Sequence, residues 1–185
     1  MKELSLNILD IAGNSVKAGA TRIIIALTET DETLSIVFED NGCGMTKEQV
    51  ESVTDPFFTT RTTRNVGLGI PFLKLAAEQT GGSFSIESTP EKDSPGNHGT
   101  KTTALFYKNN IDFTPLGDVV STVTTLIMGS PATDWLFTHI YGEKEVRMDT
   151  AEIRGVLGDD VPLDSYEVIE WIRSSLEEEY DSFYK

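Results

Sequence analysis

Residues 1–103 contain four short polar segments, each on or next to a predicted helix or strand. Asp10–Asn14 occupies the polar side of a helix whose opposite side carries apolar residues at helical spacing. Asp40–Gly44 follows an apolar strand, Gly67–Gly69 begins a second helix, and Gly99–Thr100 begins a later strand. Each segment alone is a weak signal, but the four fall in one fixed order along the chain.

The remaining pattern of this region predicts the fold class. Residues 4–18 and 67–79 have the period of helices, and residues 46–49 have the form of a capping box before a short helix. Strands are predicted from apolar and β-branched runs at 21–28, 33–39, 83–87 and 100–107. Helices on one face of a mixed, mostly antiparallel sheet give an α+β fold, a two-layer α/β sandwich.

The composition changes after residue 108, so we assign residues 1–108 to one domain and 109–185 to a small appendage. Helix, hairpin and helix-start signals predict the order α-β-β-α-α for the appendage. Residues 1–108 carry 10 basic and 14 acidic side chains, whereas 109–185 carry 5 and 16. The appendage therefore holds most of the net charge of -15 and is predicted to be an interaction module.

The four segments, with Asp55-Pro-Phe-Phe-Thr-Thr-Arg61 between them, resemble the Bergerat-fold (GHKL) ATPase superfamily. Its members include histidine kinases, DNA gyrase, the heat-shock chaperone and the mismatch-repair ATPases. The resemblance extends from Leu4 to Phe106 and implies the histidine kinase-like ATPase fold with ATP and Mg2+ as cofactors. The Phe-Phe-Thr-Thr-Arg run is most similar to nitrogen-regulation sensor kinases.

The resemblance assigns the phosphate end of the pocket to the first helix. Asn14 matches the asparagine that ligates Mg2+, a metal that prefers oxygen ligands and keeps several waters. Asp10 lies one turn earlier, where hydrolysing members carry a glutamate as general base. Aspartate is one methylene shorter, so we expect weak proton abstraction and slow hydrolysis.

The resemblance also assigns the base end and the lid. Asp40 matches the aspartate that binds adenine, Gly42 and Gly44 let the base approach the backbone, and Thr100 shares a water-mediated contact to the base. Helix-start amides after the lid are expected to meet phosphate oxygens. The remaining expected nucleotide-binding residues come from the lid and from this helix start: Phe58, Thr59, Arg61, Arg64, Gly67, Leu68 and Gly69.

Other conspicuous side chains are expected to be structural. His98 is interpreted as a surface loop residue and His139 as a packed or edge strand residue. Trp135 and Trp171 are predicted to lie in the core of the appendage. No phosphoacceptor hairpin is expected, since few residues precede Asp10.

Charge and apolar patterning exclude several partners. The acidic surface disfavours DNA and RNA, because nucleic-acid binding relies on Lys and Arg. No apolar run is long enough for a membrane span, and the single Cys43 fits a reducing cytoplasm. We expect a cytoplasmic protein without nucleic-acid or membrane partners, whose protein partner presents a basic patch.

The function of bound ATP is left open by the sequence. The chain could be a protein kinase acting in trans, an ATPase that drives conformational change in a partner, or a non-hydrolysing nucleotide-gated module of the anti-sigma-factor kind. The mismatch-repair function is not expected, because those proteins resemble strapped dimers with a large transducer domain. The whole chain is also similar to short ATP-binding proteins of fermentative anaerobes encoded near iron hydrogenase subunits, which suggests a partner in redox metabolism.

Overall fold

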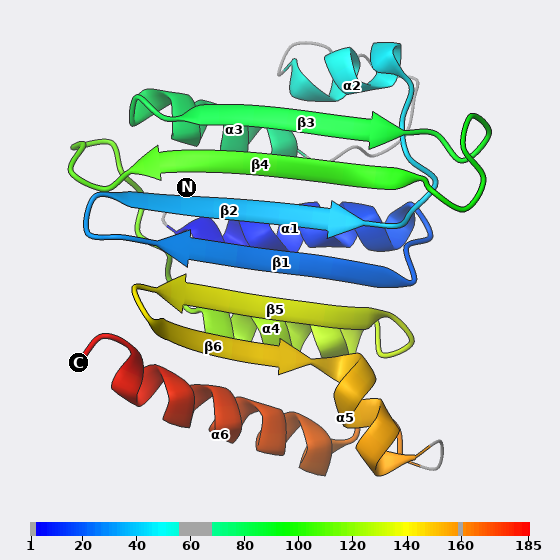
Figure 1. The fold of residues 1–185 in the computed structure, drawn as a ribbon, viewed down its shortest axis with the longest axis vertical. Helices are drawn as coiled ribbons and strands as arrows, with labels where there is room; N and C mark the ends of the chain where they lie inside the picture. The colour runs from blue at the N-terminus through cyan, green and yellow to red at the C-terminus, as the bar shows by residue number, and fades with distance from the viewer. Residues whose placement is uncertain (1–2, 56–67, 159–160) are drawn as a thin grey trace.

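The computed structural model describes residues 3–55, 68–158 and 161–185. One six-stranded sheet runs through the molecule in the order β3-β4-β2-β1-β5-β6 (Figure 1). The strands are β1 (Arg22–Glu29), β2 (Thr33–Asp40), β3 (Ser83–Thr89), β4 (Gly99–Tyr107), β5 (Asp134–Tyr141) and β6 (Lys144–Asp149). The helices are α1 (Leu4–Lys17), α2 (Lys47–Thr54), α3 (Gly69–Gln79), α4 (Val119–Gly129), α5 (Thr150–Leu157) and α6 (Tyr166–Phe183).

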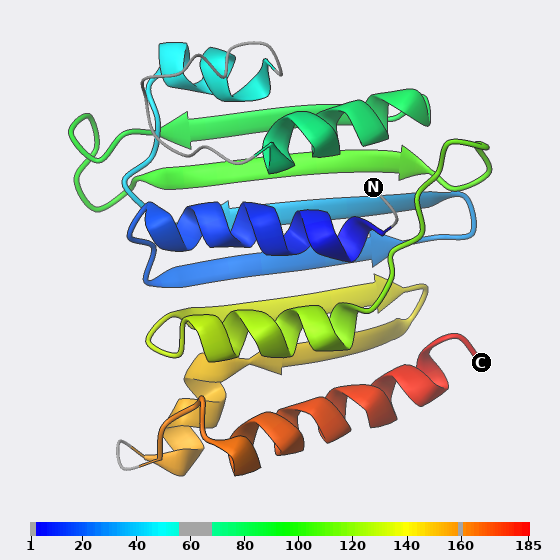
Figure 2. The same cartoon turned by 180° about the vertical axis from the view of Figure 1, so that it is seen from behind.

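The layers agree with the predicted α+β sandwich. Helices α1, α3 and α4 cover one face of the sheet, as the reverse view shows (Figure 2). Four of the five strand pairs are antiparallel, and β1 with β5 is parallel. The order after residue 108 is α4-β5-β6-α5-α6, so the predicted α-β-β-α-α order is confirmed.

Local sequence explains most of these elements. Buried and less buried residues alternate along β1 and β2, as expected for strands with one face against helices. Helix α2 begins at the predicted capping box, in which the Thr46 side chain accepts from the Gln49 amide. Helix α1 packs its apolar side against the sheet, and Gly19 follows it with a φ of 78°, a conformation that favours glycine.

The segment after residue 108 extends the same sheet. Strand β5 pairs with β1 over eight residues, from Arg22 opposite Asp134 to Glu29 opposite Tyr141. Apolar residues of α4, β5, β6 and α6 belong to the same core cluster as those of α1, β1 and β2. Strand β1 is therefore an inner strand of the sheet, with β2 on one side and β5 on the other.

A buried polar cluster ties this segment to the end of β1. The Glu29 carboxylate accepts hydrogen bonds from Lys108, from His139 Nε2 at 3.1 Å and from the Tyr184 hydroxyl at 3.0 Å. His139 is fully buried and its Nδ1 lies 2.9 Å from the Tyr180 hydroxyl. The interpretation of His139 as a packed strand residue is thus confirmed.

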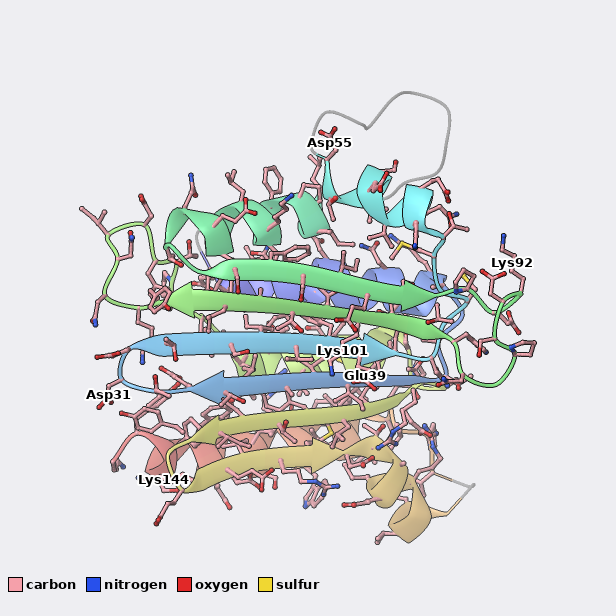
Figure 3. The ribbon with its side chains drawn as sticks, turned by 45° about the horizontal axis from the view of Figure 1, so that its top comes forward. Asp31, Glu39, Asp55, Lys92, Lys101 and Lys144 are labelled. Carbon is pink, nitrogen blue, oxygen red and sulfur yellow. The ribbon has the colours of Figure 1, made fainter. Side chains whose placement is uncertain are left out.

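The face of the sheet opposite the helices carries charged side chains near the ends of β2 and β4. Glu39 on β2 and Lys101 on β4 form an ion pair of 3.6 Å there (Figure 3).

In the described part of the chain, no helix has the length and apolar character needed to cross a membrane.

One core prediction is wrong. Trp135 is 2% exposed, as predicted, but Trp171 is 59% exposed. The reason is helical phase, because the buried side of α6 is set by Val168, Ile172 and Leu176. Trp171 lies on the flank of that stripe and not within it.

Candidate functional site

Helices α1 and α3 meet at the phosphate end of the predicted pocket. Asp10 is exposed on α1, and Asn14 lies one turn later on the same helix. A Cβ added to Gly69 would lie 2.7 Å from the Asp10 Cβ, so the first turn of α3 packs directly on Asp10. The start of α3 is therefore beside the two polar residues of α1, as the resemblance implied.

The Asn14 side chain is suited to a ligand. Its Nδ2 atom is buried and has no hydrogen-bond partner among the described residues. Leaving a buried donor unpaired costs about 1–3 kcal/mol. The side chain itself is only partly buried, and its amide oxygen is an oxygen donor of the kind that Mg2+ prefers. The residues present thus fit a Mg2+-bound triphosphate at this end.

Asp40 ends β2 with both carboxylate oxygens oriented by neighbours. Oδ1 accepts from the Gly42 amide at 2.9 Å, and Oδ2 accepts from the Ser15 hydroxyl of α1. Each carboxylate oxygen has a second lone pair and can accept one more hydrogen bond. The carboxylate is thereby held as an acceptor, which suits an exocyclic amino group such as that of adenine.

Two glycines make close backbone contacts that a side chain would block. A Cβ on Gly44 would lie 1.9 Å from the Thr89 carbonyl oxygen, and one on Gly99 would lie 1.8 Å from the Asp40 carbonyl oxygen. Both also have positive φ, 65° and 137°. The sequence therefore needs glycine at both positions to bring β2, β3 and β4 together at this end of the sheet.

Thr100 lies beside Asp40 and is held by Ser88. The β2–β4 register places Thr100 opposite Asp40. The Ser88 hydroxyl lies 2.8 Å from the Thr100 hydroxyl and 3.0 Å from the Gly99 carbonyl oxygen, and it accepts from the Met45 amide at 2.8 Å. Thr100 and Asp40 can therefore act on the same bound group.

The connection between β3 and β4 contacts the loop after Asp40. His98 Nδ1 lies 2.6 Å from the Gly42 carbonyl oxygen, and the Glu91 amide donates to the Cys43 carbonyl at 3.0 Å. His98 lies in a loop, as predicted, and it is half-buried because its ring contacts Gly42. The Cys43 side chain is exposed and its thiol forms no disulfide.

The structure brings together part of the predicted site. Asp10, Asn14 and Gly69 meet at one end, and Asp40, Gly42, Gly44 and Thr100 meet at the end of β2. Leu68 is the exposed N-cap residue of α3. The predicted lid residues Phe58, Thr59, Arg61 and Arg64, and also Gly67, lie outside the described residues. The nucleotide-binding roles of all these residues stay predictions.

Sequence reasoning missed three side chains at the site. Ser15 directly follows Asn14, but its alignment with Asp40 depends on the α1–β2 packing. Ser88 lies beyond the predicted end of its strand, and its pairing with Thr100 needs the β3–β4 register. His98 carries no local signal, because its contact depends on the path of the connection between β3 and β4.

Metal binding at this site would rely on few protein ligands. Within residues 3–55, 68–158 and 161–185, no three His, Cys, Asp or Glu side chains are grouped as a metal site. Mg2+ usually keeps several waters and is held by few protein oxygen ligands together with substrate phosphates. Asn14 is the residue predicted to supply a protein ligand in such a site, and this role stays a prediction.

Family comparison assigns the region that holds this site. Residues 2–110 match the family model described as histidine kinase-, DNA gyrase B-, and HSP90-like ATPase. This range contains all four polar segments.

Curated relatives include sensor kinases. The tetrathionate sensor histidine kinase TtrS of Salmonella typhimurium is 32% identical over 97 residues, which are 52% of this chain and 16% of that protein. The signal transduction histidine-protein kinase AtoS of Escherichia coli is 31% identical over 90 residues, 49% of this chain and 15% of that protein. The chain thus spans less than a fifth of the length of these kinases.

Solved structures share the fold. The Aquifex aeolicus MutL ATPase domain complexed with ADP superposes with a TM-score of 0.54 at 13% identity, covering 94% of this chain and 88% of that one. The N-terminal domain of a DNA repair protein gives a TM-score of 0.57 at 16% identity, covering 86% and 58%. At these identities the likeness concerns the fold alone.

Proposed function

The chain belongs to the histidine kinase-, DNA gyrase B-, and HSP90-like ATPase family and carries a histidine-kinase-like ATP-binding domain, and from that premise we propose that it is a Mg-ATP-binding regulatory protein. It acts in trans on a protein partner, by phosphorylation or by an ATP-dependent conformational switch. The observation that carries this proposal is the pairing of a fixed acceptor, Asp40, with an unsatisfied amide, Asn14, at the two ends of one site.

Each end of the site has a distinct role in this proposal. Asp40 accepts the adenine amino group, while Gly42 and Gly44 allow the base close to the backbone. Asn14 holds the divalent cation, whose chemistry is to neutralise the phosphates and the charge that develops on phosphoryl transfer. Helix α3 begins at Gly69, beside Asp10, and its N-terminal amides can donate to anionic oxygens.

Asp10 is the proposed base. It takes the proton of the attacking hydroxyl or water, and its exposed position beside Gly69 leaves it accessible to either. Its reach is about 1.5 Å shorter than that of glutamate, and a base must come within about 3 Å of the proton it removes. Intrinsic hydrolysis is therefore slow, and transfer to a protein side chain that approaches Asp10 closely is favoured.

The helical surface beside Asp10 can receive a partner. Leu68, Phe72 and Leu75 are exposed on α3, and Leu6 is exposed on α1. The three α3 residues recur at helical spacing and form one apolar stripe that starts next to Asp10. An exposed apolar stripe of this kind favours docking of a partner segment close to the phosphate end.

The acidic residues of helix α6 indicate the charge that a partner surface should carry. Its exposed residues include Glu167, Glu177, Glu178 and Asp181, with Trp171 beside them. Acidic groups in the last turns oppose the helix dipole, so a basic partner surface would relieve this repulsion. We therefore assign the partner a Lys- or Arg-rich patch. Separately, the single cysteine of the chain supports a cytoplasmic location for both proteins.

The short reach of the Asp10 side chain favours a second possible function. If Asp10 supports neither hydrolysis nor transfer, ATP binding alone would change the surface seen by the partner. The protein would then be a non-hydrolysing, nucleotide-gated binding module of the anti-sigma-factor kind.

Incubation with γ-labelled ATP and candidate partners tests the proposal. Iron hydrogenase subunits are the first candidates, because of the resemblance of the whole chain. Label on the partner that depends on Asp10 supports phosphorylation in trans, and ATP-dependent capture without label supports the gating module. Absence of both label and ATP-dependent capture, with every candidate, contradicts a role in trans.

A further inference from the structure

The loop after Asp40 is held between α1 and the end of β3. On the α1 side, the Cys43 amide donates to the Ala18 carbonyl at 2.9 Å. On the β3 side, the Met45 amide donates to Ser88 Oγ at 2.8 Å. These contacts fix both ends of the segment that follows Asp40, but neither reaches Gly42.

His98 makes the contact to Gly42. Its Nδ1 lies 2.6 Å from the Gly42 carbonyl oxygen. A carbonyl oxygen only accepts hydrogen bonds, so Nδ1 carries the proton. Of the two neutral tautomers, only the one protonated at Nδ1 can make this contact.

Gly42 connects this contact to Asp40. The Gly42 amide donates to Asp40 Oδ1 at 2.9 Å, so the same residue accepts from His98 and orients the carboxylate. Gly42 has little room to move, because a Cβ there would lie 2.9 Å from the Ala18 Cβ and 3.0 Å from Asp40 Oδ1. A shift of the Gly42 backbone would therefore turn the carboxylate away from its present direction.

We infer that His98 is a positioning residue for the base pocket: its Nδ1–H holds the Gly42 carbonyl and, through the Gly42 amide, aims the Asp40 carboxylate at the amino group of adenine. This inference rests on the proposed nucleotide site. It differs from a purely structural role, in which loss of His98 would loosen the loop and weaken every nucleotide equally.

Substituting His98 with asparagine or with glutamine distinguishes the roles of its two imidazole nitrogens. Asparagine places its amide nitrogen near the position of Nδ1, whereas glutamine places it near Nε2. His98→Asn should therefore keep the contact to Gly42, and His98→Gln and His98→Ala should lose it. Asn97→Ala, at an exposed position in the same connection, serves as the matched control.

Calorimetric titration with two nucleotides tests whether His98 orients the Asp40 carboxylate toward the amino group of the base. ATP carries the amino group, and purine riboside triphosphate lacks it. His98→Ala and His98→Gln should weaken ATP binding about 5- to 10-fold, the value of one lost hydrogen bond. They should change purine riboside triphosphate binding less than about 2-fold, whereas His98→Asn and Asn97→Ala should leave both affinities within about 2-fold of wild type.

Equal losses for both nucleotides, or a glutamine variant that binds as well as the asparagine variant, would overturn the inference. Nitrogen NMR of the imidazole in the wild-type protein gives a test that needs no folded variant: a protonated Nδ1 in the neutral ring supports the inference, and a protonated Nε2 with bare Nδ1 contradicts it. Failure of the nucleotide site itself is distinguishable. In that case wild type would bind ATP no better than Asp40→Asn, whatever residue 98 is.

Discussion

Replacing Glu29 with glutamine should destabilise the protein in a way that depends on pH. The Glu29 carboxylate accepts from Lys108, His139 and Tyr184, which come from three different parts of the chain. Burial of the group acts to raise its pKa, but the hydrogen bonds from His139, Lys108 and Tyr184 outweigh burial and lower the pKa of Glu29 from 4.5 to about 2. The ionised form is therefore the one that the fold stabilises.

The size of the effect follows from this pKa. Because the Glu29 side chain is only 10% exposed, solvent screening reduces the interaction little. The lowered pKa corresponds to about 3 kcal/mol of stability for the ionised carboxylate. A depressed pKa gives stability that is complete above the unfolded value near 4.5 and is lost as pH falls toward 2.

Urea unfolding at several pH values, followed by the fluorescence of buried Trp135, measures this contribution. Wild type should exceed Glu29→Gln in unfolding free energy by about 3 kcal/mol at pH 7, and the difference should shrink by about 2 kcal/mol at pH 3. The exposed neighbour Glu32 provides the control, since Glu32→Gln should change stability by less than about 0.5 kcal/mol. A difference between wild type and Glu29→Gln that stays constant with pH would refute the reasoning.

Changes at three further site positions, with a control on α5, test the phosphate end and the packing of the site. Asn14→Ala should remove the effect of Mg2+ on ATP affinity and leave adenosine binding intact, which titrations with and without Mg2+ measure; an unchanged metal effect would show that Asn14 is not the ligand. Gly44→Ala should lower both the melting temperature and ATP affinity, because its Cβ would meet the Thr89 carbonyl oxygen at 1.9 Å. Gly155→Ala, which has open space around it on α5, should instead stabilise by up to about 1 kcal/mol, and equal melting temperatures for the two variants would contradict this. Asp10→Ala should abolish phosphate release and Asp10→Glu should raise it, whereas turnover that survives Asp10→Ala would exclude Asp10 as the base.

Patterns that involve neighbouring residues could be predicted from the sequence. Leu34, Ile36 and Phe38 alternate with less buried residues along β2, as the period of a strand requires. The capping box of α2 depends only on Thr46 and Gln49, three residues apart. The polar segments could be placed because glycine marks positions where the backbone needs positive φ or close approach.

Contacts between distant segments could not be predicted in the same way. The parallel pairing of β5 with β1 joins residues more than a hundred positions apart, and no local period encodes it. The phase of α6 that exposes Trp171 is set by its packing against α4 and β6. Ser15 and His98 acquire their partners, Asp40 and Gly42, only when helix, strand and loop come together.

The most direct test of the nucleotide site is calorimetric titration of Mg-ATP into wild type and Asp40→Asn. Asparagine keeps the size of the side chain but replaces one acceptor oxygen with a donor nitrogen and removes the negative charge, so the group accepts fewer hydrogen bonds. Wild type should bind ATP, and the folded variant should bind it at least about tenfold more weakly, as expected for about 1–3 kcal/mol from a lost hydrogen bond and an unpaired group. Equal ATP affinity in the two folded proteins would contradict the assignment of Asp40 and of the pocket around it.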